Sequence, residues 1–198
     1  MKELLMMEEA LEIRAATETE PTTISGYALR FNSETKIGGW FRELIRPEAI
    51  PDDIQSKDVR ALWNHNSDYP IGRTKNDTLK LEKDEKGLRF TVTPPDTSWG
   101  RDAMESVKRG DVSGMSFGFF VNKEKWVEET GKIPLRELLD VELLEVSPVT
   151  FPAYPQTTAK VRSAEEILAD KPLPPKGVEI EAAKRQRELE ILEMEAKI

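Results

Sequence analysis

Apolar and polar side chains alternate along much of the chain, and this period of two is typical of β-strands with one buried face. Strands are expected at 11–17, 23–30, 39–45, 59–64, 77–81, 87–92, 113–121, 126–128 and 135–149. The segments 77–81 and 87–92 are separated only by the polar run EKDEK, so we expect them to form a β-hairpin. The pattern as a whole predicts a β-rich domain that begins near residue 10.

One segment between these strands has helical spacing instead. Over residues 98–109 the apolar positions recur every three or four residues, and basic side chains occupy the last turn. Thr97 or Ser98 is a suitable N-cap, and Gly110 is a suitable C-terminal stop because glycine adopts the left-handed conformation without strain. The pattern therefore predicts a core helix over 98–109.

The composition of the chain changes at Ser163. A short apolar run is followed by the proline-rich break KPLPPKG and then by a stretch dominated by Glu, Lys, Arg, Leu and Ala, which favours a solvated helix. We therefore divide the chain into an N-terminal extension (1–10), a globular domain (11–162) and a linker with a charged helical tail (163–198).

Composition and charge argue against several classes of function. The net charge of the 198 residues is −8, whereas proteins that bind nucleic-acid backbones are usually basic. There is no cysteine, which excludes disulfides, thiolate nucleophiles and cysteine-ligated metal sites. The sequence has no run of about 18 apolar residues, no secretory leader and no glycine-rich phosphate loop. We expect a cytosolic protein that binds neither nucleic acid nor membrane.

Any imidazole chemistry in this chain depends on its single histidine, His65. This residue follows the strand expected at 59–64, and a side chain at a strand end can be held rigidly while the next loop leaves it accessible. The neighbouring residues Asn64, Asn66 and Asp68 are ordinary turn formers. His65 is therefore a candidate general base, with a purely structural role as the alternative.

Two serines in the run GDVSGMSFG, Ser113 and Ser116, are candidate nucleophiles. Ser116 lies between Gly114 and Gly118, and small neighbours allow a substrate to approach a nucleophile. The letters match the G-x-S-x-G elbow, but that motif needs a strand before the serine and a helix after it. Here the expected helix comes first, so the elbow is rejected. A glycine-bearing strand without a catalytic role remains the alternative.

Three acidic residues on the last expected strand could assist a histidine. Strict alternation places Asp140 and Glu142 on one face of the strand and Glu145 on the other, so the three cannot all point at one site. One inward-facing carboxylate could orient an imidazole, as the third member of a serine-protease triad does. The residues alone do not choose among the three.

The run Asp96-Thr97-Ser98 nearly matches the catalytic loop of aspartic proteases. It occurs once, so a second copy of the chain would have to supply the other carboxylate. Because the run directly precedes the expected helix, it is better explained as a capping turn.

Three blocks of sequence, taken together, resemble the prohead maturation serine proteases of tailed phages. The blocks are LWNHN at 62–66, DVSGMSFGF at 111–119 and LLEVSPVTFPAYP at 143–155. The resemblance covers roughly residues 11–162. It implies a β-rich α+β fold, with a closed or nearly closed β-barrel of the kind found in the herpesvirus assemblin-like proteases, surrounded by helices and followed by the C-terminal helical tail.

The same resemblance implies roles for individual residues. The run GMSFG is similar to the herpesvirus stretch that holds the nucleophile, which favours Ser116 over Ser113, with His65 as its base. Glu145 stands where the herpesvirus enzymes have a histidine as third member, and a carboxylate suits that position because it can orient an imidazole. The alternatives for this third member are Glu142 and Asp140. The oxyanion donor would lie near Pro152, and since proline has no N–H, it would be the backbone of Ala153 or Tyr154.

The function implied by this resemblance is a serine endopeptidase that cleaves scaffold or capsid-protein extensions, and itself, during prohead maturation. Its expected substrate partner is the phage major capsid protein or scaffold, and a homodimer is also implied. Its expected location is the bacterial host cytoplasm, inside the immature prohead. No metal or organic cofactor is required. The competing hypothesis is a non-catalytic capsid assembly or scaffolding factor that binds coat protein.

Overall fold

The structure, a computed structural model, describes residues 3–8, 11–14, 21–37, 40–128, 130–150, 164–169 and 171. The strands are β1 (Glu3–Glu8), β2 (Glu12–Arg14), β3 (Thr23–Arg30), β4 (Thr35–Ile37), β5 (Phe41–Ile45), β6 (Arg60–Trp63), β7 (Asn66–Arg73), β8 (Leu79–Lys83), β9 (Gly87–Val92), β10 (Gly114–Val127) and β11 (Leu135–Val149). The helices are α1 (Ser98–Arg109) and α2 (Ala164–Ala169), with the short 3-10 turns η1 (Pro47–Ala49), η2 (Ile54–Ser56) and η3 (Thr74–Asn76).

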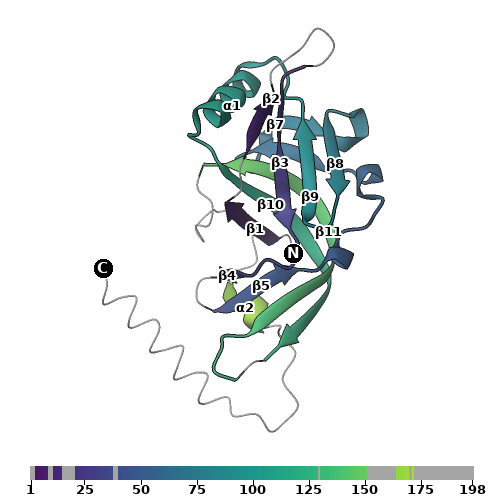
Figure 1. Cartoon of the computed structure of the whole chain (residues 1–198), viewed down its shortest axis with the longest axis vertical. Coiled ribbons are helices and arrows are strands. Elements are labelled where there is room, and N and C mark those ends of the chain that lie inside the picture. Colours follow the sequence, from purple (N-terminus) through teal and green to yellow (C-terminus); the bar gives the residue numbers. More distant parts are fainter. Residues whose placement is uncertain are drawn as a thin grey trace, which may run out of the picture.

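The larger sheet is organised around the long antiparallel pair β10 and β11. Its strand order is β1-β10-β11-β5-β4, and β11 also pairs with β6, which in turn pairs with β7. The first part of β11 lies parallel to β5 and its last part lies parallel to β6. In Figure 1, β10 and β11 run from the end of the molecule that carries α1 toward the end that carries β5 and α2. The larger sheet therefore connects the two ends of the molecule.

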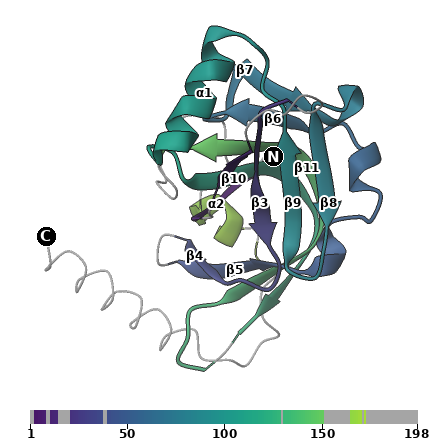
Figure 2. The same cartoon turned by 45° about the horizontal axis from the view of Figure 1, so that its top comes forward.

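The smaller sheet is antiparallel, in the order β2-β3-β9-β8. Strands β3, β9 and β8 lie side by side in both views (Figures 1 and 2). Both sheets contribute to one apolar core, in which Ile24 and Phe90 of the smaller sheet join Phe117 and Leu138 of the larger one. The expected hairpin of residues 77–81 and 87–92 is confirmed as the β8–β9 pair.

The expected closed or nearly closed barrel is wrong, because the strands form two open sheets. Barrel closure needs strand pairing around the whole circuit. Among the described residues, the edge strands β1, β4, β7, β2 and β8 each pair with a single neighbour. The larger sheet also branches at β11, which pairs with β5 and β6 at different points along its length instead of leading to one next strand. The helices of the described chain are α1 and α2, and they do not form a surrounding layer.

Helix α1 has the bounds that the sequence predicts, from Ser98 to Arg109. Thr97 is its N-cap and accepts a hydrogen bond from the Gly100 N–H, while Gly110 ends it at a φ of +80°. A side chain at Gly100 would collide with the Pro95 carbonyl oxygen, at 2.0 Å from an added Cβ, so only glycine fits there. Local capping chemistry is thus sufficient to set both ends of this helix.

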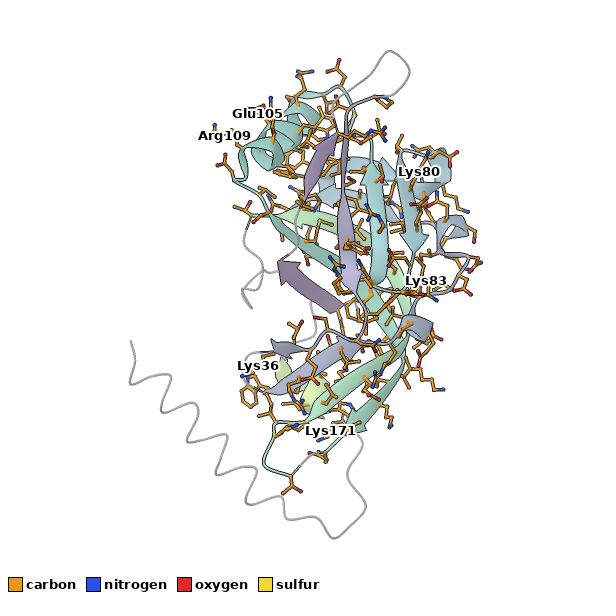
Figure 3. All side chains as sticks on the ribbon, in the orientation of Figure 1. Lys36, Lys80, Lys83, Glu105, Arg109 and Lys171 are labelled. Carbon is orange, nitrogen blue, oxygen red and sulfur yellow. The ribbon has the colours of Figure 1, made fainter. Side chains whose placement is uncertain are left out.

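Only a small part of the predicted tail is described. Within it, Lys171 forms an ion pair with Glu128 and lies 5.2 Å from the centroid of the Trp126 ring. Figure 3 shows Lys171 at the end of the molecule opposite Glu105 and Arg109 of α1. The tail helix expected beyond 171 lies outside the described residues. Neither helix of the described chain has the length and apolar character needed to cross a membrane.

Candidate active site

The β10–β11 pair places three of the polar residues of interest on one face. Ser116 of β10 is the Cα partner of Ser147 of β11, and Gly118 is the partner of Glu145. Directly opposed residues share a face, and so do residues two apart on a strand. Ser116 and Glu145 are therefore diagonal neighbours, a relation in which the Cα atoms lie about 7–8 Å apart. Gly118 puts no side chain over the carboxylate, which leaves room there for a ring from another element.

His65 enters this region from a tight turn between β6 and β7. Trp63 pairs with Asn66, so the turn contains two residues, Asn64 and His65, whose φ angles are +51° and +60°. Two consecutive positive φ angles are typical of the type I′ hairpin turn, and asparagine and histidine are among the non-glycine residues that adopt them most often. The Asn64 N–H donates to the Pro148 carbonyl at 3.1 Å, which fixes the turn to β11.

A short hydrogen bond joins His65 to Glu145. The distance from Nδ1 to Oε1 is 2.7 Å, and the two side chains are 10% and 4% exposed. An ionised carboxylate can only accept, so with Glu145 ionised and the imidazole neutral this bond assigns the ring proton to Nδ1 and the lone pair to Nε2. Nε2 is buried and has no hydrogen-bond partner within the described residues. A buried basic nitrogen held in this way is ready to accept a proton from a hydroxyl group.

The other acids of β11 lie away from the imidazole. Asp140 and Glu142 are exposed, and Asp140 accepts a hydrogen bond from Asn122 at 3.2 Å. Glu145 is buried, as expected for an inward-facing acid, but strict alternation is interrupted before it: the register with β10 shifts between Gly118 and Phe119, and Leu144 has no Cα partner there. Of the three acids, Glu145 is the one that contacts His65.

The competing sequence candidates occupy other positions. Ser113 is exposed and precedes β10, whereas Ser116 is fully buried. Asp96 is exposed and pairs with Arg101, and Thr97 caps α1, as a capping turn requires. The expected oxyanion donors, Ala153 and Tyr154, lie outside the described residues.

Two residues near His65 have contacts that sequence reasoning missed. Ser147 donates from Oγ to Oε2 of Glu145 at 2.6 Å, and both residues are buried. Asn64 Oδ1 accepts from the backbone N–H of Thr150 at 2.9 Å. The signal for Ser147 was its position two residues after an inward-facing acid on one strand. In the described part of the chain, no group of three or more His, Asp or Glu side chains is arranged to hold a metal ion.

A second buried polar cluster lies farther along the same strands. Its centre is Arg136 of β11, whose fully buried guanidinium donates to Glu3 of β1, Glu43 of β5 and Glu124 of β10. Burial, together with the charges of Glu3 and Glu124, raises the pKa of Glu43 to about 7, against the opposing effect of Arg136. We call these four residues the Arg136 cluster.

Comparison with known proteins gives a consistent result. Residues 9–170 match the family described as caudovirus prohead serine protease. The prohead protease of Enterobacteria phage HK97 is 31% identical over 164 residues, which cover 79% of this chain and 67% of that protein. The capsid polyprotein of Pseudomonas phage PAJU2 is 31% identical over 121 residues, or 57% of this chain and 18% of that protein.

The fold is also similar to that of a solved structure. The bacteriophage T4 capsid assembly protease matches with a TM-score of 0.53 and 10% sequence identity, over 75% of this chain and 98% of that one. At this level of identity the likeness concerns the fold alone. The match over residues 9–170, by contrast, covers most of the sequence, and the chain belongs to the caudovirus prohead serine protease family.

Proposed function

We propose that this chain is a serine endopeptidase in which Ser116 is the nucleophile, His65 the general base and acid, and Glu145 the residue that orients the imidazole. The observation that carries the proposal is the 2.7 Å hydrogen bond between His65 and Glu145, combined with a buried Nε2 that has no partner in the described residues. Membership of the prohead serine protease family supports the same chemistry.

The arrangement of the three residues fits the order that a triad requires. Ser116 and Glu145 lie on one face of the β10–β11 pair as diagonal neighbours, and the imidazole bound to Glu145 comes from the adjacent β6–β7 turn. The Cα atoms of diagonal neighbours on paired strands lie about 7–8 Å apart, and in a triad one imidazole lies between the serine hydroxyl and the carboxylate. Glu145 holds the tautomer in which Nε2, not Nδ1, accepts the proton.

The reaction proceeds in two balanced halves. The Ser116 oxygen bonds to the carbonyl carbon of the scissile peptide while its proton moves to Nε2 of His65. The tetrahedral intermediate then loses the amine, which takes that proton as the C–N bond breaks and leaves an acyl-enzyme. Water attacks the ester, His65 takes the proton of the water, and its return to the Ser116 oxygen releases the new carboxyl terminus.

The proposed substrates are extensions of phage scaffold or capsid protein, and the chain itself, cut inside an immature capsid in the bacterial host. This assignment is supported by relatives named as a prohead protease and a capsid polyprotein. A closed capsid also brings protease and substrate to a high effective concentration, so a slow enzyme can act there to completion.

The test is the fate of the purified full-length chain, followed by mass spectrometry alone and with co-expressed coat protein. Ser116→Ala and His65→Ala are each expected to abolish shortening, with a loss on the order of a million-fold, because neither residue acts without the other. Ser113→Ala is the matched control and keeps its activity, since Ser113 is exposed and lies outside β10. Shortening that persists in Ser116→Ala, with a normal melting curve, would exclude the proposed nucleophile and favour the non-catalytic assembly factor.

A further inference from the structure

Ser147 forms a hydrogen bond with the oxygen of the Glu145 carboxylate that His65 does not contact. Its Oγ donates to Glu145 Oε2 at 2.6 Å, while Oε1 takes the bond from His65 at 2.7 Å. Ser147 is fully buried and Glu145 nearly so. Each oxygen of the carboxylate therefore has a committed donor, as a buried carboxylate requires.

We propose that Ser147 is a positioning residue for the reaction, which holds the Glu145 carboxylate so that Oε1 faces His65. The inference rests on the proposed function, because it assigns a role beside the proposed triad. Glutamate has three rotatable side-chain bonds, so a bond to one oxygen leaves the carboxylate free to rotate about it. A second bond from the same strand removes that freedom and costs little, since Ser147 is itself fixed on a strand that pairs with β10.

The hydroxyl also changes the electron density that the imidazole meets. A donor on Oε2 spreads the negative charge of the carboxylate, so Oε1 attracts the imidazole proton less strongly. The charged residue opposite Glu145 on β6 is its Cα partner Arg60, whose exposed guanidinium contacts Asp58. Ser147 and His65 contact the two oxygens of this carboxylate at 2.6 and 2.7 Å.

Ser147 is not itself arranged as a nucleophile, although it lies directly opposite Ser116. A nucleophilic hydroxyl gives its proton to the base, which here is Nε2 of His65. The proton of Ser147 is directed at Glu145 instead. The two serines therefore have different roles, and their alanine variants are expected to behave differently.

The first experiment compares Ser147→Ala with Ser147→Thr, using Ser113→Ala as a matched serine-to-alanine control. We expect Ser147→Ala to slow self-shortening about 10- to 100-fold, the effect of losing one hydrogen bond to a charged group. The acidic limb of the pH–rate profile of Ser147→Ala should also move to higher pH. Without the Ser147 hydroxyl, the Glu145 carboxylate holds the imidazole proton more tightly. Ser147→Thr keeps the hydroxyl and is expected to retain the wild-type pH profile; if threonine does not fold in this buried position, Ser147→Cys, a weak donor of similar size, is expected to give an intermediate rate.

The second experiment observes the imidazole without any need for turnover. His65 is the single histidine, so 15N-histidine labelling gives one pair of ring-nitrogen signals in the NMR spectrum. In a Ser116→Ala background, which does not consume itself, Nδ1 is expected to carry the proton. Adding Ser147→Ala should shift the titration of the ring to higher pH, in the same direction as the pH–rate profile, and adding Glu145→Gln should change the tautomer outright. A structural role alone would lower the melting temperature and leave both signals unchanged.

The outcomes separate this inference from the proposed function. If Ser147→Ala has the wild-type rate, pH profile and ring-nitrogen signals, the positioning role is wrong while the triad stands. If Ser147→Ala is as inactive as Ser116→Ala and its ring-nitrogen signals are unchanged, Ser147 acts in another way and the inference also fails. If Ser116→Ala still shortens itself, the proposed nucleophile fails, and the NMR comparison continues to test the contact between Ser147 and Glu145.

Discussion

The long strands β10 and β11 hold two buried polar clusters that are built differently. At one end, His65, Glu145 and Ser147 form a linear chain of hydrogen bonds that stops at Nε2, which has no partner among the described residues. Farther along, Arg136 is surrounded by the carboxylates of three other strands. In the first cluster one nitrogen, Nε2 of His65, is left to accept a proton in the proposed reaction. In the second cluster the guanidinium donates to carboxylates on three strands.

The difference separates the proposed site from the Arg136 cluster. The Arg136 cluster contains the raised pKa of Glu43, yet three carboxylates around one guanidinium explain that shift as a consequence of burial and surplus negative charge. Perturbed ionisation alone therefore does not single out the proposed site. An unsatisfied buried atom at the end of an ordered chain is more informative. The two clusters should respond differently to substitution, one in rate and the other in stability.

After the loss of Ser116 or His65 themselves, the largest expected effect is on rate, in Glu145→Gln. An amide can donate to Nδ1 and thereby favour the wrong tautomer, a change that costs on the order of ten-thousand-fold in other serine proteases. Slow cleavage should remain above the Ser116→Ala background, and adding His65→Ala should give little more loss than His65→Ala alone. The rate of self-shortening measures this effect.

The matched control for that variant is Glu142→Gln, an exposed acid on the same strand. It should leave the rate unchanged. If Glu142→Gln or Asp140→Asn is damaging while Glu145→Gln is silent, the third member is misassigned.

The largest expected effect on stability is in Arg136→Met. This change leaves the buried carboxylates without their cation, and removal of one partner from a buried ion pair typically costs about 3–5 kcal/mol. Arg73→Met is the control, because Arg73 pairs with Asp58 at the surface, where such a pair contributes at most about 1 kcal/mol. Urea denaturation compares the two, and Arg136→Lys, which keeps the charge, should lose less than Arg136→Met. Equal losses in Arg136→Met and Arg73→Met would contradict a structural role for the Arg136 cluster.

A smaller, pH-dependent effect is expected in Glu43→Gln. The pKa of Glu43 in the folded state, about 7, lies above its ordinary value of 4.5, so the folded state binds this proton more tightly than the unfolded state. Stability from this group is present below pH 4.5 and is lost as the pH rises through about 7. A glutamine at this position does not titrate. The free energy of unfolding of the variant, relative to that of the wild type, should therefore rise by at most about 3 kcal/mol between roughly pH 4.5 and pH 8.

Urea denaturation at several pH values measures that gain. The charges that face Glu43 are Arg136, Glu3 and Glu124, and all three remain in the variant. A difference between the two proteins that stays constant across this pH range would show that Glu43 does not take up a proton there. Self-shortening should be the same in both proteins at a pH where both are folded, because the Arg136 cluster lies outside the proposed site.

Features set by neighbouring residues could be predicted from the sequence, and features set by distant pairing could not. The bounds of α1 follow from Thr97 and Gly110, which act on their own helix. Strand β1 was not predicted, because its partner β10 lies more than a hundred residues away. Strand β7 was also missed, because its first residues resemble turn formers until the two-residue turn pairs them with β6. Barrel closure failed as a prediction for the same reason, since it depends on which edges meet.

The candidate site also has parts that could be predicted from the sequence and parts that depend on distant pairing. Strict alternation predicted that Glu145 differs from Asp140 and Glu142, and it does differ in burial, but the register shift before Glu145 could not be predicted from the sequence. The resemblance of the three sequence blocks selected Glu145. The contact between His65 and Glu145 spans 80 positions and depends on the parallel pairing of β6 with β11, which no local pattern reports. The bond from Ser147 depends on the side-chain conformation of Glu145, so it became visible only in the structure.

The smallest expected effect concerns Asn64, which belongs to neither cluster but holds the turn that presents His65. Its φ of +51° is left-handed, and its side chain accepts the Thr150 N–H. Asn64→Gly loses the side-chain bond and keeps an unstrained turn, whereas Asn64→Ala loses the bond and adds left-handed strain of about 1 kcal/mol. The alanine variant should therefore unfold about 1 kcal/mol more easily than the glycine variant in urea, and it should also shorten itself more slowly because His65 is less firmly placed. Equal stability and equal rates in the two variants would show that the strained turn does not contribute to the placement of His65.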